Sequence, residues 1–365
     1  MLRNTTILLM VLCGSLTLLH CTSYKMLVGT YTRNTPSEGI YALEFDGNAN
    51  LISKALLIES DNPSYLSISP DEKYLYAVNE SGQSFVCAYQ FDKTKPALTF
   101  LNKSSVQRGP CYITSSERHV FTANYSSGSL TVLGRKPNGE VTDTLQVIKH
   151  PRKQFGRGLE GPSNAHQIIF SPNGKFLVAT NLGTDRVFSY QYNPNSETEI
   201  LQYTDEVIVK KGSGPRHATF SKDGRFLYLV QELDGSLTVF SVTQDGKLAI
   251  LQETTLVTDK SQKSSAADIH LSPDGKFLYA TNRADVNNIT CFQVLSNGTV
   301  KLIEQYPTLG NHPRNFTISP DGKFIFIGNQ RTNNITIYKR NKRSGKLKLK
   351  TDKIDIGAPA CLLFY

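Results

Sequence analysis

Short runs of alternating apolar and polar residues, separated by turn residues, extend along most of this chain. The clearest example spans residues 214–232, where an apolar alternation leads into the turn Asp223-Gly224 and a second apolar run follows. A period of two predicts β-strands, and an Asp-Gly turn between two such runs predicts a hairpin. The strands of a hairpin are antiparallel, so the start of the first and the end of the second lie at the same end.

This hairpin pattern returns along the chain at intervals of roughly fifty residues. Each copy has a small residue or Pro, an apolar alternation, a turn related to Ser-Pro-Asp-Gly, an apolar run and a closing Asn or Gln. The closing residues are Asn79, Asn124, Asn181, Gln231, Asn282 and Asn329. Two further apolar runs follow each hairpin. Four short strands in a unit of this length are typical of a β-propeller blade.

Six units are complete, and a seventh is split between the two ends of the chain. Residues 357–365 have the first-strand pattern with nothing after it, whereas residues 25–31 and 39–43 supply the strands that would follow. Pairing the two ends closes the ring and removes the open edges of a linear array. We therefore predict an all-β fold, a single seven-bladed β-propeller with four-stranded blades over residues 24–365. A long loop is expected at residues 149–160.

The first twenty residues predict export. Arg3 supplies a positive start, and the apolar core of residues 7–19 is too short to span a membrane. The end of this segment resembles a bacterial lipoprotein signal, so residues 1–20 are predicted to be a signal peptide and Cys21 the lipidated first mature residue. His20 replaces the small residue usual before that cysteine, which leaves ordinary signal-peptidase cleavage as the alternative. Both routes predict a periplasmic or cell-envelope protein of a bacterium, and the lipoprotein route adds a lipid on Cys21 as the membrane attachment.

The charge distribution and the cysteine content limit which macromolecular partners and metal ions the chain is expected to bind. The net charge is +9, and its densest basic run is residues 339–350. That run suits either a surface for nucleic acid or anionic lipid, or a solvated hairpin at a sheet edge where lysines block pairing. We favour the hairpin and predict no nucleic-acid partner. The four cysteines after Cys21 are widely spaced, which predicts buried free thiols rather than a zinc site.

Two positions of the repeat vary although their neighbours recur. Seven residues before the turn Asp or Asn lie Ser64, His166, Arg216, Ala267 and Arg314. Nine residues after it lie Glu80, Leu182, Glu232, Arg283 and Gln330. Hairpin geometry places both positions at one mouth of the propeller channel. Arginines, a histidine and a carboxylate gathered there predict a site for an anionic ligand, with hydrated ion pairs between blades as the structural alternative.

Further polar residues flank the same strands. Asp268 and His270 lie on a first strand, and Asp185 and Arg186 follow a second strand. For His270, as for His217, a core position is an equally good interpretation. The sequence lacks the G-x-S-x-G, H-E-x-x-H, Walker and G-x-G-x-x-G motifs in their required contexts. With these catalytic motifs absent, the reaction type that the sequence favours is acid–base catalysis on an anionic substrate.

Five segments around these positions resemble segments of a known protein family. They are residues 182–186, 214–217, 231–232, 266–270 and 313–314, to which the opening residues 27–32 are added. Together they resemble the seven-bladed propeller lactonase family, which includes propeller-type bacterial 6-phosphogluconolactonases and fungal carboxymuconate-lactonising enzymes. The resemblance covers nearly the whole mature chain and implies lactone chemistry without a cofactor at the channel mouth.

The resemblance also implies roles for residues. The catalytic His, Arg, Glu and Arg of the family correspond to His166, Arg216, Glu232 and Arg283, with Arg314 as the alternative for the last. The expected activity is hydrolysis of 6-phosphogluconolactone or a related sugar lactone, a small anionic substrate. The arginines are expected to bind the anion and the oxyanion, Glu232 to activate water, and His166 to protonate the leaving ring oxygen. Substrate contacts are expected from Arg314, Asp185, Arg186, Asp268, His270 and Gln330.

Two other functions stay open. One is a lactonising cycloisomerase, in which His166 protonates a carbon atom and no water is consumed. The other is a non-catalytic surface propeller that binds a carbohydrate or a protein through aromatic side chains at the mouth. Its candidate aromatic residues are Tyr31, Tyr65, Tyr112 and Tyr125.

Overall fold

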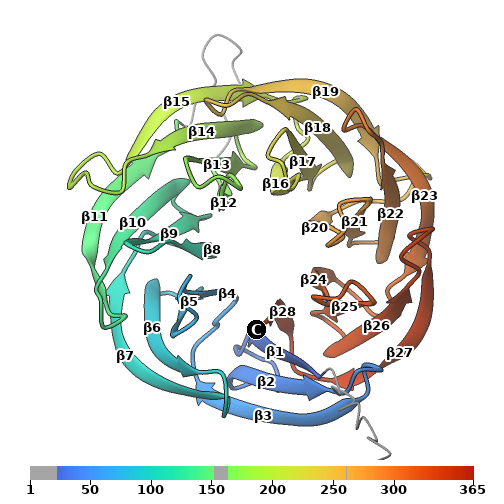
Figure 1. The fold of residues 1–365 in the computed structure, drawn as a ribbon, viewed down its shortest axis with the longest axis horizontal. Helices are drawn as coiled ribbons and strands as arrows, with labels where there is room; N and C mark the ends of the chain where they lie inside the picture. Colours follow the sequence, from blue (N-terminus) through green and yellow to red (C-terminus); the bar gives the residue numbers. More distant parts are fainter. Residues whose placement is uncertain (1–22, 152–162, 260) are drawn as a thin grey trace, which may run out of the picture.

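The computed structural model describes residues 23–151, 163–259 and 261–365. All 28 elements assigned within these ranges are β-strands. They form seven four-stranded antiparallel sheets arranged around a central axis (Figure 1). The predicted seven-bladed β-propeller is confirmed. The predicted signal peptide at residues 1–20, Cys21, and nearly all of the loop expected at residues 149–160 lie outside the described residues.

The strands of each blade run from the channel to the outer rim. Blade 1 is β28 (Pro359–Phe364), β1 (Tyr24–Thr30), β2 (Gly39–Phe45) and β3 (Leu51–Glu59). Blade 2 is β4 (Tyr65–Ile68), β5 (Tyr74–Asn79), β6 (Phe85–Asp92) and β7 (Ala97–Ser105). Blade 3 is β8 (Pro110–Ser115), β9 (His119–Asn124), β10 (Ser129–Arg135) and β11 (Val141–Lys149). Blade 4 is β12 (Ala165–Phe170), β13 (Phe176–Asn181), β14 (Arg186–Tyr192) and β15 (Leu201–Ile208).

The remaining three blades follow the same order. Blade 5 is β16 (Pro215–Phe220), β17 (Phe226–Gln231), β18 (Ser236–Val242) and β19 (Leu248–Thr255). Blade 6 is β20 (Ala266–Leu271), β21 (Phe277–Asn282), β22 (Asn288–Val294) and β23 (Val300–Pro307). Blade 7 is β24 (Pro313–Ile318), β25 (Phe324–Asn329), β26 (Asn334–Arg340) and β27 (Leu347–Asp355).

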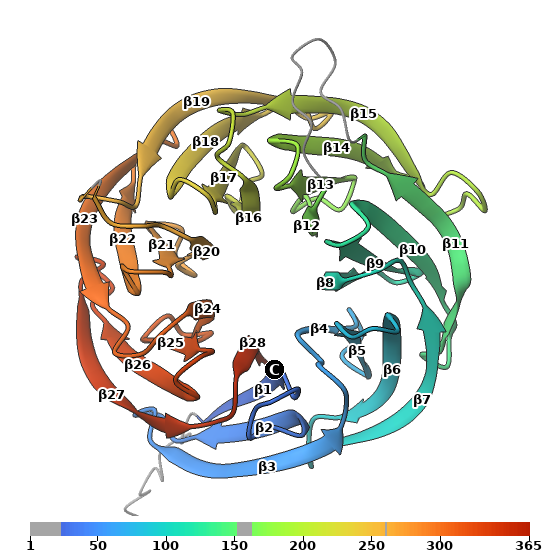
Figure 2. The same cartoon turned by 180° about the vertical axis from the view of Figure 1, so that it is seen from behind.

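The two ends of the chain close the ring. The C-terminal strand β28 pairs antiparallel with β1, and this register places Met26 opposite Phe364 and Gly29 opposite Cys361. Figures 1 and 2 show β28 as the inner strand of the blade whose other three strands come from the N-terminal end. The closure predicted from the split repeat is confirmed. It leaves no blade without a neighbour, which removes the open edge of a linear array.

The core lies between the faces of neighbouring blades. Between blades 5 and 6, for example, Tyr228, Val230, Ile269 and Phe292 are packed together and almost fully buried. Burying one large apolar side chain contributes about 1.5–3 kcal/mol. All residues of the second strands β13, β21 and β25 are buried, whereas the outer strands are largely exposed. The second strands, which Arg283 and Gln330 directly follow, are therefore the most fully buried.

The recurrent turn fixes the register of each inner hairpin. In blade 6 the Ser272 hydroxyl donates to Asp274 Oδ1 at 2.5 Å and accepts from the Phe277 backbone N–H at 3.0 Å. Gly275 adopts φ of +70°, which favours glycine. Because this turn sets which residues of the two strands face each other, it also sets which residues flank the strands at the far mouth.

Three further features are the cysteine thiols, the basic run near the C-terminus and the search for membrane-spanning helices. Cys87, Cys111, Cys291 and Cys361 are buried and free, as predicted. The basic run at residues 339–350 lies on the hairpin of β26 and the outermost strand β27. Across the part of the chain that the structure describes, no helix is long and apolar enough to cross a membrane.

Candidate active site

Glu232 is the central carboxylate of the predicted mouth. It follows directly after β17, and its backbone N–H donates to the carbonyl of Gly214 at 2.7 Å. Its Oε2 accepts from Arg216 Nε at 2.8 Å and lies 2.9 Å from Arg283 Nη2. Its Oε1 has one long contact, 3.5 Å from the Ser265 hydroxyl. Oε1 therefore keeps acceptor capacity for another molecule.

The two arginines bridge three blades. Arg216, on β16, also donates to the carbonyl of Ala267 in blade 6. Arg283, which follows β21, donates through Nε to the carbonyl of Ser265 at 2.9 Å and through Nη1 to His312 Nε2 in blade 7 at 3.2 Å. Both guanidinium groups are thus buried and held by several acceptors. Side chains fixed in this way are preorganised for a reaction.

The charges of this cluster stabilise an ionised Glu232. Burial alone would raise the pKa of Glu232, but Arg283, Arg216 and Arg314 lower it below its ordinary value. Burial and the nearby Arg216 lower the pKa of Arg283 to about 9, against the opposing effect of Glu232. The carboxylate is therefore ionised at neutral pH, and the cations around it outnumber it.

Arg314 lies near a second carboxylate at the mouth, that of Glu80. Its guanidinium is stacked on the ring of Tyr31, 5.0 Å from the centroid, and its Nη2 is 4.0 Å from Glu80 Oε2. The same Glu80 oxygen accepts from Tyr31 at 2.5 Å and from Ser64 at 2.8 Å. Arg314 has no closer polar contact within the described residues. Its N–H donors are therefore the most available of the three arginines.

His166 lies below the arginines on β12 and is 4% exposed. Its ring is 5.7 Å from that of Tyr125 and 5.1 Å from that of His217. Burial, followed by the charges of Arg216, His217 and the other two arginines, lowers the pKa of His166 well below its usual value. Without a ligand the imidazole is therefore neutral at neutral pH.

Asp268 lies deeper in the channel than the mouth residues, and its predicted contact with substrate stays a prediction. Its carboxylate accepts from His217 Nδ1 at 2.7 Å, His270 Nε2 at 2.9 Å and Asn315 Nδ2 at 2.6 Å. The backbone N–H groups of Ile269 and Phe316 complete its contacts. All these partners are donors from the protein, so Asp268 holds β16, β20 and β24 together.

His270 lies at the other end of the channel. It lines a cavity of about 520 Å³ together with turn residues Ser69 and Pro70 and the C-terminal Tyr365. Strands rise by about 3.3 Å per residue, so His270 lies about 10 Å along β20 from Ala267 at the mouth. His270 is therefore not among the residues brought together at the mouth, and its predicted contact with substrate stays a prediction.

Asp185 and Arg186 have structural partners. The Asp185 carboxylate accepts the backbone N–H groups of Gly212 at 2.7 Å and Gly214 at 3.0 Å, which fixes the loop that enters β16. Arg186 is buried and paired with Glu206 on the outer strand β15. Neither lies free at the mouth. Gln330 occupies the predicted position after β25, and its Oε1 is buried with no partner among the described residues.

Sequence reasoning missed several mouth residues. Glu80 occupies the same repeat position as Glu232, but the repeat alone gives it no role in the predicted site. His312 precedes the strand that carries Arg314, and burial together with Arg283 lowers its pKa to about 2. Of the four tyrosines considered, Tyr31 and Tyr125 lie at the mouth, whereas Tyr65 and Tyr112 pack on each other at 4.2 Å beside His217.

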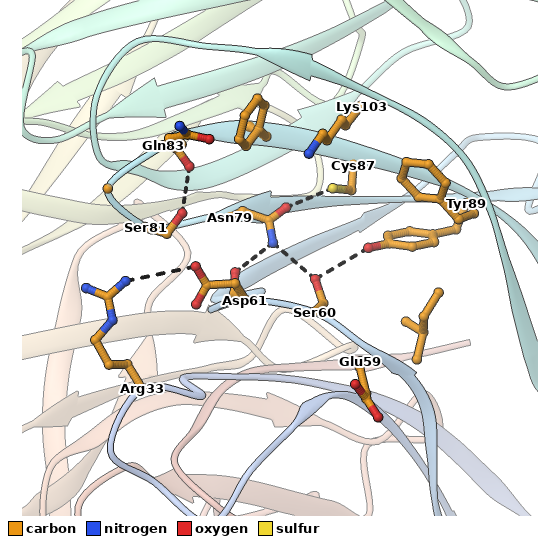
Figure 3. Close-up of a pocket in the computed structure, with 14 residues that line it drawn as sticks. Arg33, Glu59, Ser60, Asp61, Asn79, Ser81, Gln83, Cys87, Tyr89 and Lys103 are labelled. Atoms are coloured by element: carbon orange, nitrogen blue, oxygen red, sulfur yellow. Dashed lines mark hydrogen bonds and ion pairs between the residues drawn. The ribbon is translucent and has the colours of Figure 1, made fainter.

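A separate cleft of about 730 Å³ lies between blades 1 and 2 (Figure 3). Arg33 and Asp61 lie 4.0 Å apart across it, and the Cys87 thiol donates to Asn79 Oδ1 at 2.9 Å. Its charges balance, and no cluster of donors converges on one point. Within the described ranges, no group of three His, Cys, Asp or Glu residues is arranged to hold a metal ion.

Known proteins share this whole architecture. Residues 25–364 match the family described as "Lactonase, 7-bladed beta-propeller". A 6-phosphogluconolactonase of Formosa agariphila is 34% identical and that of Bacillus subtilis 30%, covering 93% and 94% of this chain and 99% of each relative. The solved structure of the periplasmic gluconolactonase of Pseudomonas aeruginosa is 33% identical with a TM-score of 0.88, covering 94% of this chain and 99% of that one. The resemblance seen in the sequence is confirmed: this chain belongs to the seven-bladed β-propeller lactonase family.

Proposed function

We propose that the protein hydrolyses a sugar lactone that carries an anionic group, 6-phosphogluconolactone or a related sugar lactone. The observation that carries this proposal is the convergence of Arg216, Glu232 and Arg283 at one mouth, with His166 close beneath them. Relatives named 6-phosphogluconolactonase and gluconolactonase support it.

Arg314 is the best anchor for the anionic group of the substrate. Arg216 and Arg283 already donate to Glu232 and to backbone carbonyls, whereas the polar contact of Arg314 among the described residues is the 4.0 Å approach to Glu80. Hydrogen bonds to charged groups contribute about 1.5–3 kcal/mol each. Arg216 and Arg283 are then left to stabilise the oxyanion that forms at the lactone carbonyl.

Proton transfer is divided between the other two side chains. Glu232 accepts a proton from water through Oε1 while the water oxygen bonds to the carbonyl carbon. The tetrahedral oxyanion collapses, the bond from the carbonyl carbon to the ring oxygen breaks, and His166 protonates that oxygen. The products are a hydroxycarboxylate and one proton released to solvent.

Substrate binding prepares both groups for this reaction. Burial and the charges of the arginines keep His166 neutral in the free protein, and the arginine charges outweigh burial and keep Glu232 weakly basic. An anion bound at Arg314 offsets part of that positive charge, which raises the pKa of both groups. His166 can then carry the proton that it donates. An uncharged lactone lacks this effect and is expected to react more slowly.

We further propose that the protein acts outside the cytoplasm. The export signal predicted at residues 1–20 supports this, as does the periplasmic location in the name of the Pseudomonas aeruginosa relative. Mass spectrometry of the mature N-terminus tests it. A diacylated Cys21 supports lipid anchoring, a lipid-free N-terminus near residue 21 supports simple secretion, and an intact Met1 contradicts export.

A lactone panel tests the activity. The mature protein is incubated in a pH-stat with 6-phosphogluconolactone, gluconolactone and an uncharged aliphatic lactone, and acid release is compared with spontaneous opening. The expected result is acceleration of the sugar lactones, largest for the anionic one. Rates equal to the spontaneous rates for all three would contradict the proposal.

A further inference from the structure

Blade 7 carries more positive charge on its outer edge than the other described blades. Its outer strand β27 contains three lysines, whereas each of the other six outer strands contains at most one. The end of β26 and the turn after it add five basic residues, and no acidic residue interrupts the run at residues 339–350. Lysines that serve only to block edge pairing would suit every exposed outer strand. Edge protection therefore leaves the excess on blade 7 unexplained.

Most of these cations are exposed and have no carboxylate partner. Arg340 is buried and paired with Asp274, and Lys346 lies 3.4 Å from Glu304. The other basic side chains of the run are exposed and have no carboxylate within 4.0 Å among the described residues. They are Lys339, Lys342, Arg343, Lys348 and Lys350. Their charge is therefore available to an anion from outside the protein.

The turn at residues 341–346 lies on the face opposite the candidate active site. Strand β24 starts at the mouth, and the strands of the blade alternate in direction, so the turn between β26 and β27 lies at the far end of the channel. Arg340 Nε accordingly donates at 2.6 Å to the carbonyl of Gly322, in the turn between β24 and β25. A surface bound at residues 341–346 would leave the mouth open.

The N-terminal strand begins near this turn. The Tyr24 hydroxyl donates to Asp321 Oδ2 in blade 7 at 2.9 Å. Lys350 Nζ donates to Asn50 Oδ1 in blade 1 at 2.8 Å, and β27 and β3 lie next to each other on the rim (Figures 1 and 2). Cys21, the residue predicted to carry lipid, precedes Tyr24 by three residues, which span at most about 10 Å. Lipid attached there would bring the basic run close to a membrane.

We propose that residues 339–350, the basic hairpin, bind the phosphate groups of an anionic lipid surface and orient the protein with its mouth away from that surface. Exposed charges interact over a Debye length of about 8 Å at physiological ionic strength, which is similar to the reach of the predicted lipid attachment. Each Lys or Arg close to an anionic surface strengthens binding about fivefold. This inference goes beyond the proposed lactone hydrolysis and does not depend on it.

The composition of the basic hairpin fits lipid better than nucleic acid. Single-stranded nucleic acid is bound by cations together with aromatic side chains on which the bases stack. Residues 339–350 contain no aromatic residue. Leu349, which is 45% exposed, instead places an aliphatic side chain among the lysines. Cations around an exposed apolar side chain are typical of surfaces that bind at the lipid headgroup level.

Vesicle binding by the mature protein without lipid tests the proposal. Protein that begins at residue 22 is mixed with vesicles of phosphatidylcholine alone, or of phosphatidylcholine and phosphatidylglycerol in equal parts, and the bound fraction is measured by sedimentation. We expect binding only to the anionic vesicles, and we expect it to weaken as salt is added, because salt screens exposed charges. Equal binding to both kinds of vesicle, or binding to neither at low salt, would overturn the proposal.

Charge reversal locates the binding surface. The triple variant Lys342→Glu, Arg343→Glu, Lys348→Glu removes three exposed cations that have no carboxylate partner. It is expected to weaken binding to the anionic vesicles at least about 100-fold, from about fivefold for each charge. All three side chains are exposed, so the thermal unfolding midpoint should stay close to that of wild type. A folded triple variant that binds like wild type would overturn the proposal.

A second triple variant is the matched control. Lys149→Glu, Lys211→Glu and Lys263→Glu change the net charge by the same amount at exposed positions on the mouth side of the ring. Binding to the anionic vesicles is expected to stay within about threefold of wild type. A loss as large as that of the first variant would show that net charge alone drives binding, which would overturn the assignment to the basic hairpin.

Hydrogen exchange tests the orientation and needs no lactone turnover. Anionic vesicles should slow backbone exchange in residues 340–350 and leave residues 214–232, which form the hairpin at the mouth, unchanged. Slower exchange at residues 214–232 instead would contradict the orientation. A single-stranded RNA that binds more tightly than the vesicles and depends on the same three cations would identify nucleic acid as the partner and overturn the proposal.

Discussion

Arg216 and Glu232 are separated by 16 residues in the sequence, yet Arg216 Nε lies 2.8 Å from Glu232 Oε2. The hairpin of β16 and β17 explains this distance, because Pro215 and Gln231 are paired and the next residues extend toward the same mouth. The pair is joined by Arg283 from the neighbouring blade. An ion pair within one blade thus becomes part of a cluster that spans two neighbouring blades.

Replacing Glu232 by Gln should abolish most of the activity. The amide keeps the shape and one hydrogen-bond acceptor, but it cannot take a proton from water. We expect kcat to fall about 10²–10⁴-fold, the usual contribution of a general base. Steady-state kinetics on 6-phosphogluconolactone measure this, with Glu304→Gln on the outer strand β23 as control. Activity within threefold of wild type would show that Glu232 is not the base.

The lowered pKa of Glu232 makes a separate prediction about pH. A base must be ionised, so kcat/KM should hold as pH falls and be lost only as pH passes through the pKa of the free enzyme. Arg283 and Arg216 place that pKa below the ordinary glutamate value of 4.5. The acid limb of a pH profile of kcat/KM should therefore lie below 4.5. An acid limb near neutrality would mean that another group activates the water.

Arg314→Gln should change substrate preference. Its guanidinium is the most available cation at the mouth, so its loss should weaken binding of the anionic lactone by about 10–150-fold, the equivalent of 1.5–3 kcal/mol. KM for gluconolactone, which lacks the phosphate, should change much less. Arg118→Gln, on an exposed turn of blade 3, is the control. Equal effects on both lactones would show that Arg314 does not bind the phosphate.

The repeat explains how much of this site the sequence predicts. Counting from each turn gives the strand ends, because the turn fixes the register, and this count predicts Arg216, Glu232, Arg283 and Arg314 at one mouth. Depth along a strand and partners on outer strands are not set by that count. The sequence therefore misplaced His270, which lies several residues farther along its strand, and Arg186, whose partner Glu206 is on β15.

Glu80 shows a second limit of the same reasoning. It occupies the repeat position of Glu232, but its contacts come from Tyr31 in blade 1 and Arg314 in blade 7. Contacts across three blades depend on side-chain length and on the curvature of the ring, which a linear repeat does not contain. The fold followed from local patterns, whereas the pairing of charges at the mouth required the closed ring.

Asp268→Asn should destabilise the protein. The carboxylate accepts five hydrogen bonds in the channel, and an amide group would place two N–H donors against existing donors. The expected loss is about 3–5 kcal/mol, the usual cost of removing one partner of a buried charged network. Urea unfolding measures it, with Asp143→Asn on exposed strand β11 as control.

The pH dependence of that loss has a definite sign. The folded-state pKa of Asp268 is held below its ordinary value of 3.8, because His270 and His217 outweigh its burial. A depressed pKa gives stability that is present above the unfolded value and lost as pH falls through the folded one. Asp268 also raises the pKa of His270 above its ordinary value of 6.5, against the effect of burial. The difference between wild type and Asp268→Asn should therefore be largest near about pH 5, decrease as pH rises through the raised pKa of His270, and keep the contribution of the buried carboxylate at about pH 8. A difference that disappears completely at the alkaline end of this range would contradict the assignment of a buried anion.

Hydrolysis in ¹⁸O-labelled water tests the central claim most directly. Wild-type protein and 6-phosphogluconolactone are mixed in labelled water, and the acid product is analysed by mass spectrometry against an enzyme-free control. We predict one ¹⁸O in the carboxylate of each product molecule, formed well above the spontaneous rate by wild type and about 10²–10⁴-fold more slowly by Glu232→Gln. Product formed by the enzyme without label, or no acceleration by wild type, would contradict water attack at this mouth.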